Sequence, residues 1–396
     1  MISNSDSPII FIAALEGVLF EFTGIKKAYS YTLEMTSNLL TGETAVGGLV
    51  DLKNQMEEVK ISDELDESAS LVFHLFYEAG LALESKVDLC LDQDTPMGFF
   101  FEFSEKEPIL LSRLAPLLRI ETKGPSEQEY GEAFKKGLRH LRRGDCYQYN
   151  LTFPFFIKFA PTSAENFLAH CWKDRESIGR YASFTSIKGL KVALLSNSPE
   201  CLFQIKKEDN GFHVETFPIK GTQSMERDDE QSAWSKLSSS LKDESELFMI
   251  TDLMRSDLSR LTGQWADVLA KKEKMIVPGL LHSYSHLRSA LAPETTLLKV
   301  AQCLFPGGSI TGAPKIRVME IIHELEGEPR GFYCGSTVIK TANTLQGSIN
   351  IRSGELDCDR GVLKYHSGGG ITFESSLESE YQEMWDKVQS FSRLLL

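Results

Sequence analysis

Residues 126–159 read SEQEYGEAFKKGLRHLRRGDCYQYNLTFPFFIKF, and they join the pattern of a helix to the pattern of a strand. Ser126 is a favoured helix N-cap, apolar residues follow at the spacing of a surface helix, and Gly144 is a typical stop signal. From Tyr147 onward, the residues alternate as in a strand. The stretch therefore predicts a helix that leads directly into a long strand.

Strand-like runs continue toward the C-terminus, and turn signals separate several of them in the manner of antiparallel pairs. The clearest are KVALLSNS (191–198), GFHVETFPI (211–219), FYCGSTVIK (332–340), GSINIRSGEL (347–356) and GVLKYHSGGG (361–370). Helical patterns lie between them, so we predict an α+β fold in which helices cover large antiparallel sheets. KGPS (123–126) marks a boundary between an N-terminal part, residues 1–123, which contributes strands and helices to the sheets, and a second region, residues 124–396.

The charge and hydropathy of the chain favour a small-molecule substrate. It has 42 Lys and Arg residues against 56 Asp and Glu, a net charge of −14, with no basic run. This balance argues against nucleic acid and against an anionic membrane surface as partners. PIIFIAALEGVLF (8–20) is apolar but is interrupted by Glu16 and Gly17, and no window reaches the ~20 uninterrupted apolar residues of a membrane helix. We expect this stretch to form a core strand.

The seven cysteines are scattered and show no CxxC spacing, so the sequence suggests neither a zinc site nor a disulfide framework. Such cysteines fit a reducing compartment, and we expect a cytoplasmic protein. Cys201 and Cys334 lie in strand-like runs, where a small buried thiol is the expected state.

Gly307, Gly308 and Gly312 give the segment PGGSITGAPKIRVMEIIHELEG (306–327) a tight backbone ahead of a predicted helix. A glycine-rich loop that feeds a helix N-terminus is a natural anion site, because free N–H groups and the helix dipole both favour negative charge. Ala313 stands where a P-loop would need lysine. On spacing alone, an ordinary turn between loop and helix is the more common interpretation.

A second glycine cluster precedes a helix in SGGGITFESSLESEYQEMWDKVQSF (367–391). Glu380, Glu383 and Lys387 share one face of that helix, and apolar residues follow another. Carboxylates in such a row can hold a hard cation through their oxygens. A solvated face with an ordinary pair between Glu383 and Lys387 is the more common case.

Another acidic helix is predicted in KDESELFMITDLMRSDLSR (242–260). Asp243 and Glu246 lie one turn apart there, beside the apolar Leu247 and Ile250. The pattern has the same two interpretations, a cation site or a solvated face, and the residues alone do not decide between them.

Glu200 and Lys220 each stand near the end of a strand-like run, in NSPECLFQI and in ETFPIKGTQ. A buried glutamate can act as a general acid when its pKa is raised, and a desolvated lysine can act as a nucleophile when its pKa falls from about 10.4 toward roughly 7–8. Surface turns with solvated charges are the usual case for such positions. His286 in HSYSHLRS can be a base or, more commonly, a satisfied core histidine.

The chain contains, in this order, GDCYQYNLT, SPE, PIKGT, a KDxxE helix leading to DLMRSDLSR, SHL, FPGGSITGAPK, INIR, SGGGI and EYQE. These motifs resemble those of the chorismate-utilising enzymes, the family of anthranilate synthase, aminodeoxychorismate synthase, isochorismate synthase and salicylate synthase. The resemblance runs from Glu127 to Val388. It implies two large packed antiparallel sheets with helices on the outside, and it makes residues 124–396 the chorismate-binding catalytic region.

The resemblance implies a Mg²⁺ site in which Glu246 and Glu383 coordinate the ion directly. Glu380 and Asp243 would lie nearby as water-mediated ligands. The ion is expected to take the ring carboxylate of chorismate, because a protein of net charge −14 must supply local positive charge to hold a dianion.

The resemblance also implies the other groups that contact the substrate. The carboxylate-binding positions would be Tyr333, Arg352, the backbone of Gly368, Gly369 and Gly370, and Lys387. Ser309 and Thr311 are expected to shape the ring pocket. Thr311 and His286 would join Glu200 and Lys220 as the catalytic residues.

Within this family, the residue before the glycine of the PIxGT motif distinguishes activities, with alanine in anthranilate synthases and lysine in many aminodeoxychorismate synthases. Here it is Lys220. The resemblance therefore implies that the Lys220 amine attacks ring carbon 2 while Glu200 protonates the departing hydroxyl at carbon 4. Ammonia then adds at carbon 4 and expels the lysine, which gives 4-amino-4-deoxychorismate on the way to 4-aminobenzoate and folate.

Two alternatives stay open. The chain can be anthranilate synthase component I or another chorismate-converting enzyme, or it can be a family member that binds a metabolite without turnover. The resemblance also implies that ammonia is used, and we find no glutaminase segment between Met1 and Leu396 and no cysteine nucleophile motif. We therefore expect a separate glutamine amidotransferase subunit as the partner that supplies ammonia.

Overall fold

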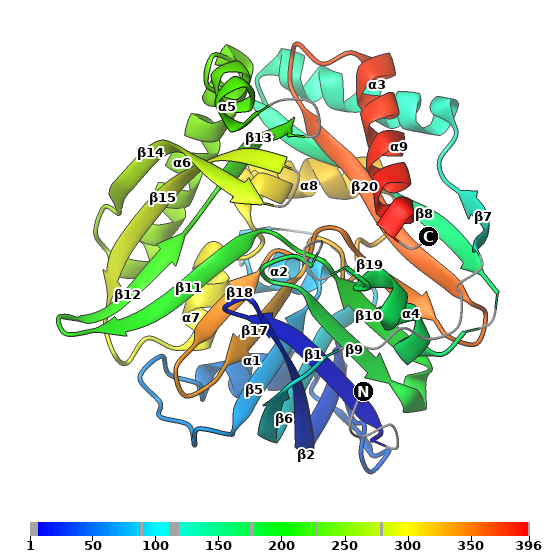
Figure 1. Ribbon diagram of the computed structural model, residues 1–396, viewed down its shortest axis with the longest axis vertical. Coiled ribbons are helices and arrows are strands. Elements are labelled where there is room, and N and C mark those ends of the chain that lie inside the picture. Colours follow the sequence, from blue (N-terminus) through cyan, green and yellow to red (C-terminus); the bar gives the residue numbers. More distant parts are fainter. Residues whose placement is uncertain are drawn as a thin grey trace.

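Antiparallel strand pairs organise the whole structure (Figure 1). In the part that the structure describes, they follow one another as one continuous ladder from β7 to β14. The computed structural model describes residues 7–84, 86–87, 90–110, 119–160, 162–174, 178–225, 229–277 and 280–394.

In the order of the ladder, the strands are β7 (Arg119–Lys123), β8 (Gln148–Phe159), β20 (Val362–Ile371), β19 (Ser353–Asp357), β10 (Val192–Ser196), β9 (Ser183–Ile187), β1 (Ile9–Leu15), β2 (Val18–Thr32), β6 (Pro96–Pro108), β5 (Ser70–Leu75), β17 (Ser336–Lys340), β18 (Leu345–Ser348), β11 (Cys201–Glu208), β12 (Gly211–Thr216), β15 (Leu280–Leu291) and β14 (Asp267–Val277). Short strands are added at β2, at β15 and at β8, namely β3 (Met35–Asn38) with β4 (Thr44–Val46), β13 (Ile219–Ser224) and β16 (Gly312–Ala313). The helices are α1 (Gly48–Glu57), α2 (Tyr77–Leu83), α3 (Glu127–Arg143), α4 (Ala164–Cys171), α5 (Glu230–Ser238), α6 (Leu241–Thr262), α7 (Leu297–Leu304), α8 (Lys315–Glu326) and α9 (Leu377–Leu394), with 3₁₀ turns η2 (Lys188–Leu190) and η3 (Gly308–Ile310).

Strand β1 shows why the ladder folds into two layers. Every residue of β1 is buried, as expected for a strand covered on both faces. Ile9, Phe11 and Ala13 face a core that also contains Phe101 of β6 and Ile339 of β17, from the opposite half of the ladder. The residues between them face a second core, which β1 shares with β8, β20 and several helices.

Helices cover the outer faces of both layers (Figure 1). α3, α4, α8 and α9 share a core with β8, β9, β10 and β20, whereas α1, α2, α6 and α7 share another with β5, β6 and β11. Each sheet thus buries one face against the other sheet and one face against helices. The predicted α+β class, with two packed antiparallel sheets and outer helices, is confirmed.

Helix α3 begins and ends where the sequence predicts. The Ser126 hydroxyl accepts the N–H of Glu129, and the Glu129 carboxylate accepts the N–H of Ser126, which is a capping box. Gly144 closes the helix with a φ of 77°, a conformation that suits glycine. Strand β8 follows, as predicted.

Three strand predictions differ from the structure because the backbone turns where periodicity gives no sign of it. GSINIRSGEL (347–356) is divided between β18 and β19 at Arg352, which has a φ of 50°. Cys334 precedes β17 with a φ of 60° instead of lying within the strand. PIIFIAALEGVLF (8–20) is a hairpin of β1 and β2, which turns at Glu16 and Gly17. A positive φ outside glycine is uncommon, so a pattern of apolar residues does not predict it.

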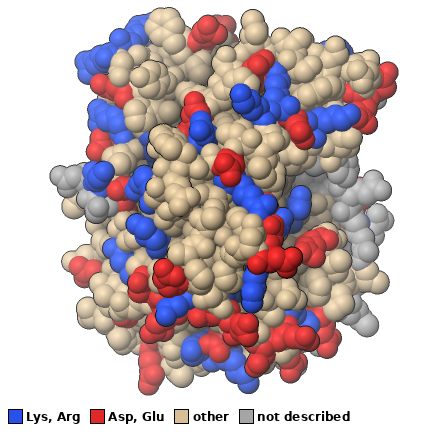
Figure 2. Space-filling model, turned by 90° about the vertical axis from the view of Figure 1, so that its left-hand side faces the viewer, with Lys and Arg blue, Asp and Glu red and all other residues tan. Residues whose placement is uncertain are grey.

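The N-terminal part contributes strands to both layers, since β1 pairs with β9 and β5 pairs with β17. The predicted boundary at residue 123 falls between β7 and α3 and stays a prediction. On the face that Figure 2 shows, basic and acidic side chains are interspersed, and acidic ones gather toward its lower edge. Among the helices that the structure describes, none has the length and apolar character needed to cross a membrane.

His74 on β5 is a buried titratable group between the layers, with Nδ1 3.0 Å from Thr337 Oγ1 and Nε2 2.7 Å from Thr185 Oγ1. Burial lowers its pKa to about 3 from the ordinary 6.5. Between these values the unfolded chain binds the proton and the folded chain does not. The contribution of His74 to the free energy of unfolding is therefore largest above pH 6.5. As the pH falls from 6.5 toward 3, protonation of His74 in the unfolded chain lowers the free energy of unfolding by about 1.4 kcal/mol per pH unit.

We expect His74→Gln to remove the part of the pH dependence that His74 causes. The free energy of unfolding, measured by urea titration from pH 7 to pH 4, should therefore fall less steeply than in the wild type. His323→Gln, at an exposed histidine of α8, is the matched control and should keep the wild-type slope. Equal slopes in wild type and His74→Gln would contradict the assignment.

Gly368 and Gly369 are neighbours in β20 but have different surroundings. A Cβ at Gly368 would lie 1.9 Å from the carbonyl oxygen of Leu151, whereas at Gly369 the nearest atom would be Glu380 Oε2 at 3.3 Å. Since the Leu151 carbonyl belongs to β8 and cannot move alone, Gly368→Ala should lower the free energy of unfolding by about 2–4 kcal/mol, and Gly369→Ala by less than about 1 kcal/mol. Urea titrations test this, with Gly189→Ala in open space as the control. Similar losses at both positions would refute it.

Candidate active site

The glycine-rich segment 306–312 forms a compact loop against β8. The Thr311 hydroxyl donates to the Gly307 carbonyl at 2.9 Å, and the Asn150 N–H donates to the Thr311 carbonyl at 2.8 Å. Gly312 has a φ of 144°, and a Cβ there would lie 2.1 Å from the Gln148 carbonyl oxygen. The hydroxyl of Thr311 is fully buried and bonded to the loop's own backbone, so its catalytic role stays a prediction.

The start of α8 is joined to α6 by a buried ion pair between Lys315 and Asp257. Pro314 is the N-cap residue of α8. Burial raises the pKa of Asp257, and the Lys315 ammonium opposes that rise. The predicted loop-to-helix transition is confirmed, while its use as an anion site stays a prediction.

Glu200, immediately before β11, is the buried carboxyl at the centre of the candidate site. Burial raises its pKa, and the Ser309 hydroxyl, the Lys220 ammonium and the Arg352 guanidinium oppose the rise. The fold thus brings together four predicted residues that are far apart in the sequence. A carboxyl held toward its protonated form beside an amine has the properties of a general acid.

Lys220 lies in β13 and faces α6. Its Nζ is 3.9 Å from Glu246 Oε2, and the two side chains are 17% and 18% exposed. The register of β13 shifts at Gly221, which has a φ of 81°, and a Cβ there would lie 3.1 Å from the Asp243 side chain. The glycine of PIKGT therefore lets α6 pack closely against the strand that carries the lysine.

The acidic face of α9 lies against the glycine cluster of β20. Lys387 Nζ donates to the Gly368 carbonyl at 2.8 Å and pairs with Glu383 Oε1 at 2.8 Å. A Cβ at Gly369 would have Glu380, Glu383 and Lys387 within 4 Å. The predicted shared face is confirmed. Glu380 on this face is buried rather than solvated.

This arrangement suits Mg²⁺ in its chemistry. Glu380 and Glu383 present oxygens beside Gly369, while Glu246 faces Lys220. Among the described residues, no three His, Cys, Asp or Glu side chains converge as a preformed metal cage. Mg²⁺ is commonly held by one or two carboxylates, with water and substrate oxygens completing its shell. The oxygen donors are therefore of the kind that Mg²⁺ prefers, and the magnesium site stays a prediction.

Arg352 and Tyr333 come from the irregular segments on either side of β17 and β18. The carbonyl of Arg352 accepts the N–H of Asn197 at 3.0 Å, and its guanidinium acts on Glu200. Tyr333 stacks on His366 with ring centroids 5.3 Å apart, and burial raises the pKa of its hydroxyl. Both residues are tied to their places by tertiary contacts, and their substrate contacts stay predictions.

His286 on β15 has partners of its own. Its Nε2 is 3.5 Å from Glu215 Oε1, and its ring stacks on Phe217 with centroids 4.5 Å apart. Glu215 is buried and also pairs with Lys206 at 2.8 Å. The predicted role of His286 as a catalytic group is neither supported nor opposed by these contacts and stays a prediction.

His282 is a residue that the sequence did not single out. Its Nδ1 is 2.8 Å from the hydroxyl of Thr222, in the PIKGT motif, and burial together with the charge of Arg352 lowers its pKa to about 4. Its imidazole is therefore neutral at neutral pH, where it can donate one hydrogen bond and accept another. Its spacing of four from His286 places both on one face of a strand, which was the available signal.

The chain is similar in sequence to known proteins of one family. Residues 67–393 match the model of a family described as chorismate binding enzyme. The aminodeoxychorismate synthase component 1 of Salmonella typhimurium is 38% identical over 268 residues, and that of Klebsiella aerogenes is 36% identical over 269 residues; each match covers 66% of this chain. The matches span only 56% and 57% of the two relatives' own lengths.

A solved structure resembles almost the whole chain. Anthranilate synthase component I from Streptococcus pneumoniae superimposes with a TM-score of 0.76 and 20% identity, covering 99% of this chain and 94% of that one. At this identity, the likeness concerns the fold. Together with the match over residues 67–393, it leaves one conclusion, that the chain belongs to the chorismate binding enzyme family.

Proposed function

We propose that the protein aminates chorismate at ring carbon 4 and forms 4-amino-4-deoxychorismate. The observation that carries this proposal is a lysine, Lys220, whose charge acts on the buried Glu200, a carboxyl with a raised pKa. A nucleophilic amine and a carboxylic acid are the two groups that the reaction needs. Two relatives that are named aminodeoxychorismate synthase component 1 support the same activity.

The chemistry assigns one step to each group. The neutral Lys220 amine bonds to ring carbon 2, both ring double bonds shift, and the hydroxyl at carbon 4 leaves as water with a proton from Glu200. Ammonia then bonds to carbon 4 and gives a proton to the Glu200 carboxylate, both double bonds shift back, and the Lys220 amine leaves carbon 2. The enolpyruvyl group is retained, so no pyruvate is released.

Positive groups around this centre would hold the two carboxylates of chorismate. Arg352 and Lys387 supply charge, and the backbone of Gly368–Gly370 approaches the substrate without intervening side chains. Glu246, Glu380 and Glu383 are the carboxylates that would hold Mg²⁺, which neutralises the ring carboxylate when bound.

The ammonia would come from a separate glutamine amidotransferase. The relatives' name, component 1, implies a second component for those proteins. Ammonia is small and uncharged when it reacts, so it can be passed between subunits, and a separable contact between them is expected to be modest and partly polar. Free ammonium at alkaline pH would replace the partner in an assay.

Anthranilate synthase is the main alternative, with amination at carbon 2 and loss of pyruvate. Lys220 favours carbon 4, because a lysine bonded to carbon 2 blocks that carbon to ammonia. A family member without turnover is the other alternative. The raised pKa of Glu200 beside Lys220 speaks against it, because such a pair has a cost in stability and a use in catalysis.

The first test is the product. With chorismate, Mg²⁺ and ammonium at alkaline pH, mass spectrometry should find aminodeoxychorismate without pyruvate, and glutamine should replace ammonium only when an amidotransferase is added. Lys220→Ala should lower the rate by about 10³-fold or more with unchanged thermal unfolding, because a covalent step is lost. Lys191→Ala, which removes an exposed lysine paired with Asp359, is the control. Anthranilate with pyruvate would identify the alternative, and a normal rate in Lys220→Ala would exclude the nucleophile.

The second test concerns the metal. Glu246→Gln and Glu383→Gln should each raise the Mg²⁺ concentration for half-maximal activity by about tenfold or more, since each removes a charged oxygen ligand. Glu378→Gln, at an exposed position on the first turn of α9, should leave the titration unchanged. Wild-type magnesium titrations in both site variants would rule out a two-glutamate site.

A further inference from the structure

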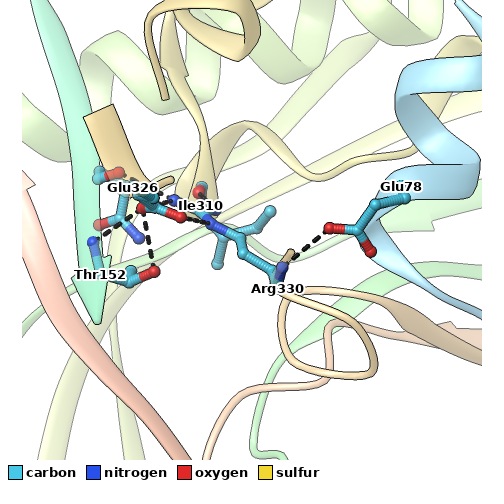
Figure 3. A network of polar contacts seen from close by, with 6 residues as sticks. Glu78, Thr152, Ile310, Glu326 and Arg330 are labelled. Carbon is cyan, nitrogen blue, oxygen red and sulfur yellow. Dashed lines mark hydrogen bonds and ion pairs between the residues drawn. The ribbon is translucent and has the colours of Figure 1, made fainter. Parts of the chain in front are cut away.

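Arg330 is a fully buried arginine in the segment between α8 and β17 (Figure 3). Its guanidinium donates to both oxygens of Glu326, from Nε at 2.8 Å and from Nη2 at 2.6 Å. It also donates to two carbonyls, from Nη1 to Ile310 at 2.8 Å and from Nη2 to Asn150 at 2.9 Å. A planar fork of donors can serve these three partners at once, which a lysine ammonium cannot.

One of the two carbonyls belongs to the glycine-rich loop 306–312, and the other belongs to β8, the strand that pairs with the glycine cluster Gly368–Gly370. Ile310 lies between Ser309 and Thr311 in the loop 306–312. Asn150 lies on β8 opposite Gly370 of β20.

Glu326 extends the same connection along β8. Its Oε1 accepts the N–H of Thr152 at 2.8 Å and the Thr152 hydroxyl at 3.0 Å, and Thr152 lies opposite Gly368. One ion pair therefore joins the loop 306–312 to the strand that lies against Gly368–Gly370.

The backbone of the same residue is fixed from the other side (Figure 3). The N–H groups of Arg330 and Gly331 donate to the two oxygens of Glu78 on α2, at 2.8 and 3.1 Å. The guanidinium also lies over the ring of Tyr77, 4.6 Å from its centroid. Both contacts come from α2, so this helix holds the segment that leads to Tyr333, three residues after Arg330.

We propose that Arg330 is a positioning residue, which with Glu326 holds the two glycine-rich segments at the separation that a dicarboxylate substrate requires. This inference rests on the proposed function in so far as chorismate is the ligand of both segments. Arg330 touches no substrate, and it acts through the carbonyls of Ile310 and Asn150. A displacement of about 1 Å in such a site can cost about 100-fold in rate.

The first variant is Arg330→Lys, which keeps a positive charge for Glu326 but not the fork. The dissociation constant for chorismate, measured by calorimetry, and KM should each rise about tenfold or more, and kcat should fall as well. Arg317→Lys is the matched control, because Arg317 also belongs to the α8 region and pairs with a glutamate, Glu320, but is exposed. The control should bind chorismate like the wild type.

A second variant separates positioning from stability. Replacing a buried ion pair by apolar residues of similar size often preserves or raises stability. The double variant Arg330→Met with Glu326→Leu leaves neither charge of the pair unpaired, so it should fold, at a lower unfolding temperature because Ile310, Asn150 and Thr152 have lost hydrogen-bond partners. It should bind chorismate about tenfold or more weakly. If the variants only reduced the amount of folded protein, the apparent kcat would fall and KM would stay at the wild-type value. A raised KM therefore indicates a change in the site rather than a loss of folded protein.

Normal chorismate binding and KM in Arg330→Lys, or in a folded double variant, would overturn the inference. The outcome differs from a failure of the proposed function, because binding is measured whatever product forms. If the wild type binds chorismate but releases anthranilate, the proposed function fails and Arg330 keeps its role provided that both variants bind weakly. If the wild type does not bind chorismate, the proposed function and the proposed role of Arg330 are both refuted.

Discussion

The pairing of β8 with β20 is the constraint on which the candidate site depends. Ten successive residue pairs, from Val362 with Lys158 to Ile371 with Tyr149, fix which residues of β8 lie opposite Gly368–Gly370. At Gly368 the strands leave no room for a side chain, so the backbone itself forms the surface there. Lys387 of α9 donates to the Gly368 carbonyl, and the Glu326 carboxylate accepts the N–H of Thr152 on β8. The glycine cluster, Lys387 and Glu326 therefore take their relative positions from one ladder.

Charge balance bears on how an acidic protein would hold the anionic substrate that we propose. The positive groups of the site do not stand alone, because Lys220 faces Glu246, Arg352 acts on Glu200, and Lys387 pairs with Glu383. Such pairs keep buried or half-buried charges tolerable while the site is empty of substrate. A dianion must then share these cations with the resident carboxylates. A divalent cation would relieve this competition, which is the physical case for Mg²⁺ in a protein of net charge −14.

Local signals predicted much of this protein, and long-range contacts account for the rest. The limits of α3 follow from Ser126 and Gly144 alone, because capping acts within one turn. The division of GSINIRSGEL at Arg352 and the burial of Glu380 were missed, since both are imposed by packing against other strands and helices. The family motifs named Glu200, Lys220, Ser309 and Arg352, which the fold does bring together. His282 escaped because its partner is known only once β13 lies beside β15.

The segment that carries Tyr333 shows how the irregular parts of the site stay ordered. Its backbone N–H groups at Arg330, Gly331 and Phe332 are bonded to the buried carboxylates of Glu78 and Glu355 instead of to a strand. Burial raises the pKa of both glutamates, to about 7 for Glu78, so each carboxylate is held at a cost in stability at neutral pH. Buried N–H groups without partners would cost more, because their lost bonds to water would go unreplaced. Carboxylates supplied from α2 and β19 therefore allow a non-repetitive backbone to be as well defined as a strand, which is what a side chain such as Tyr333 needs if it is to meet a small rigid substrate in one orientation.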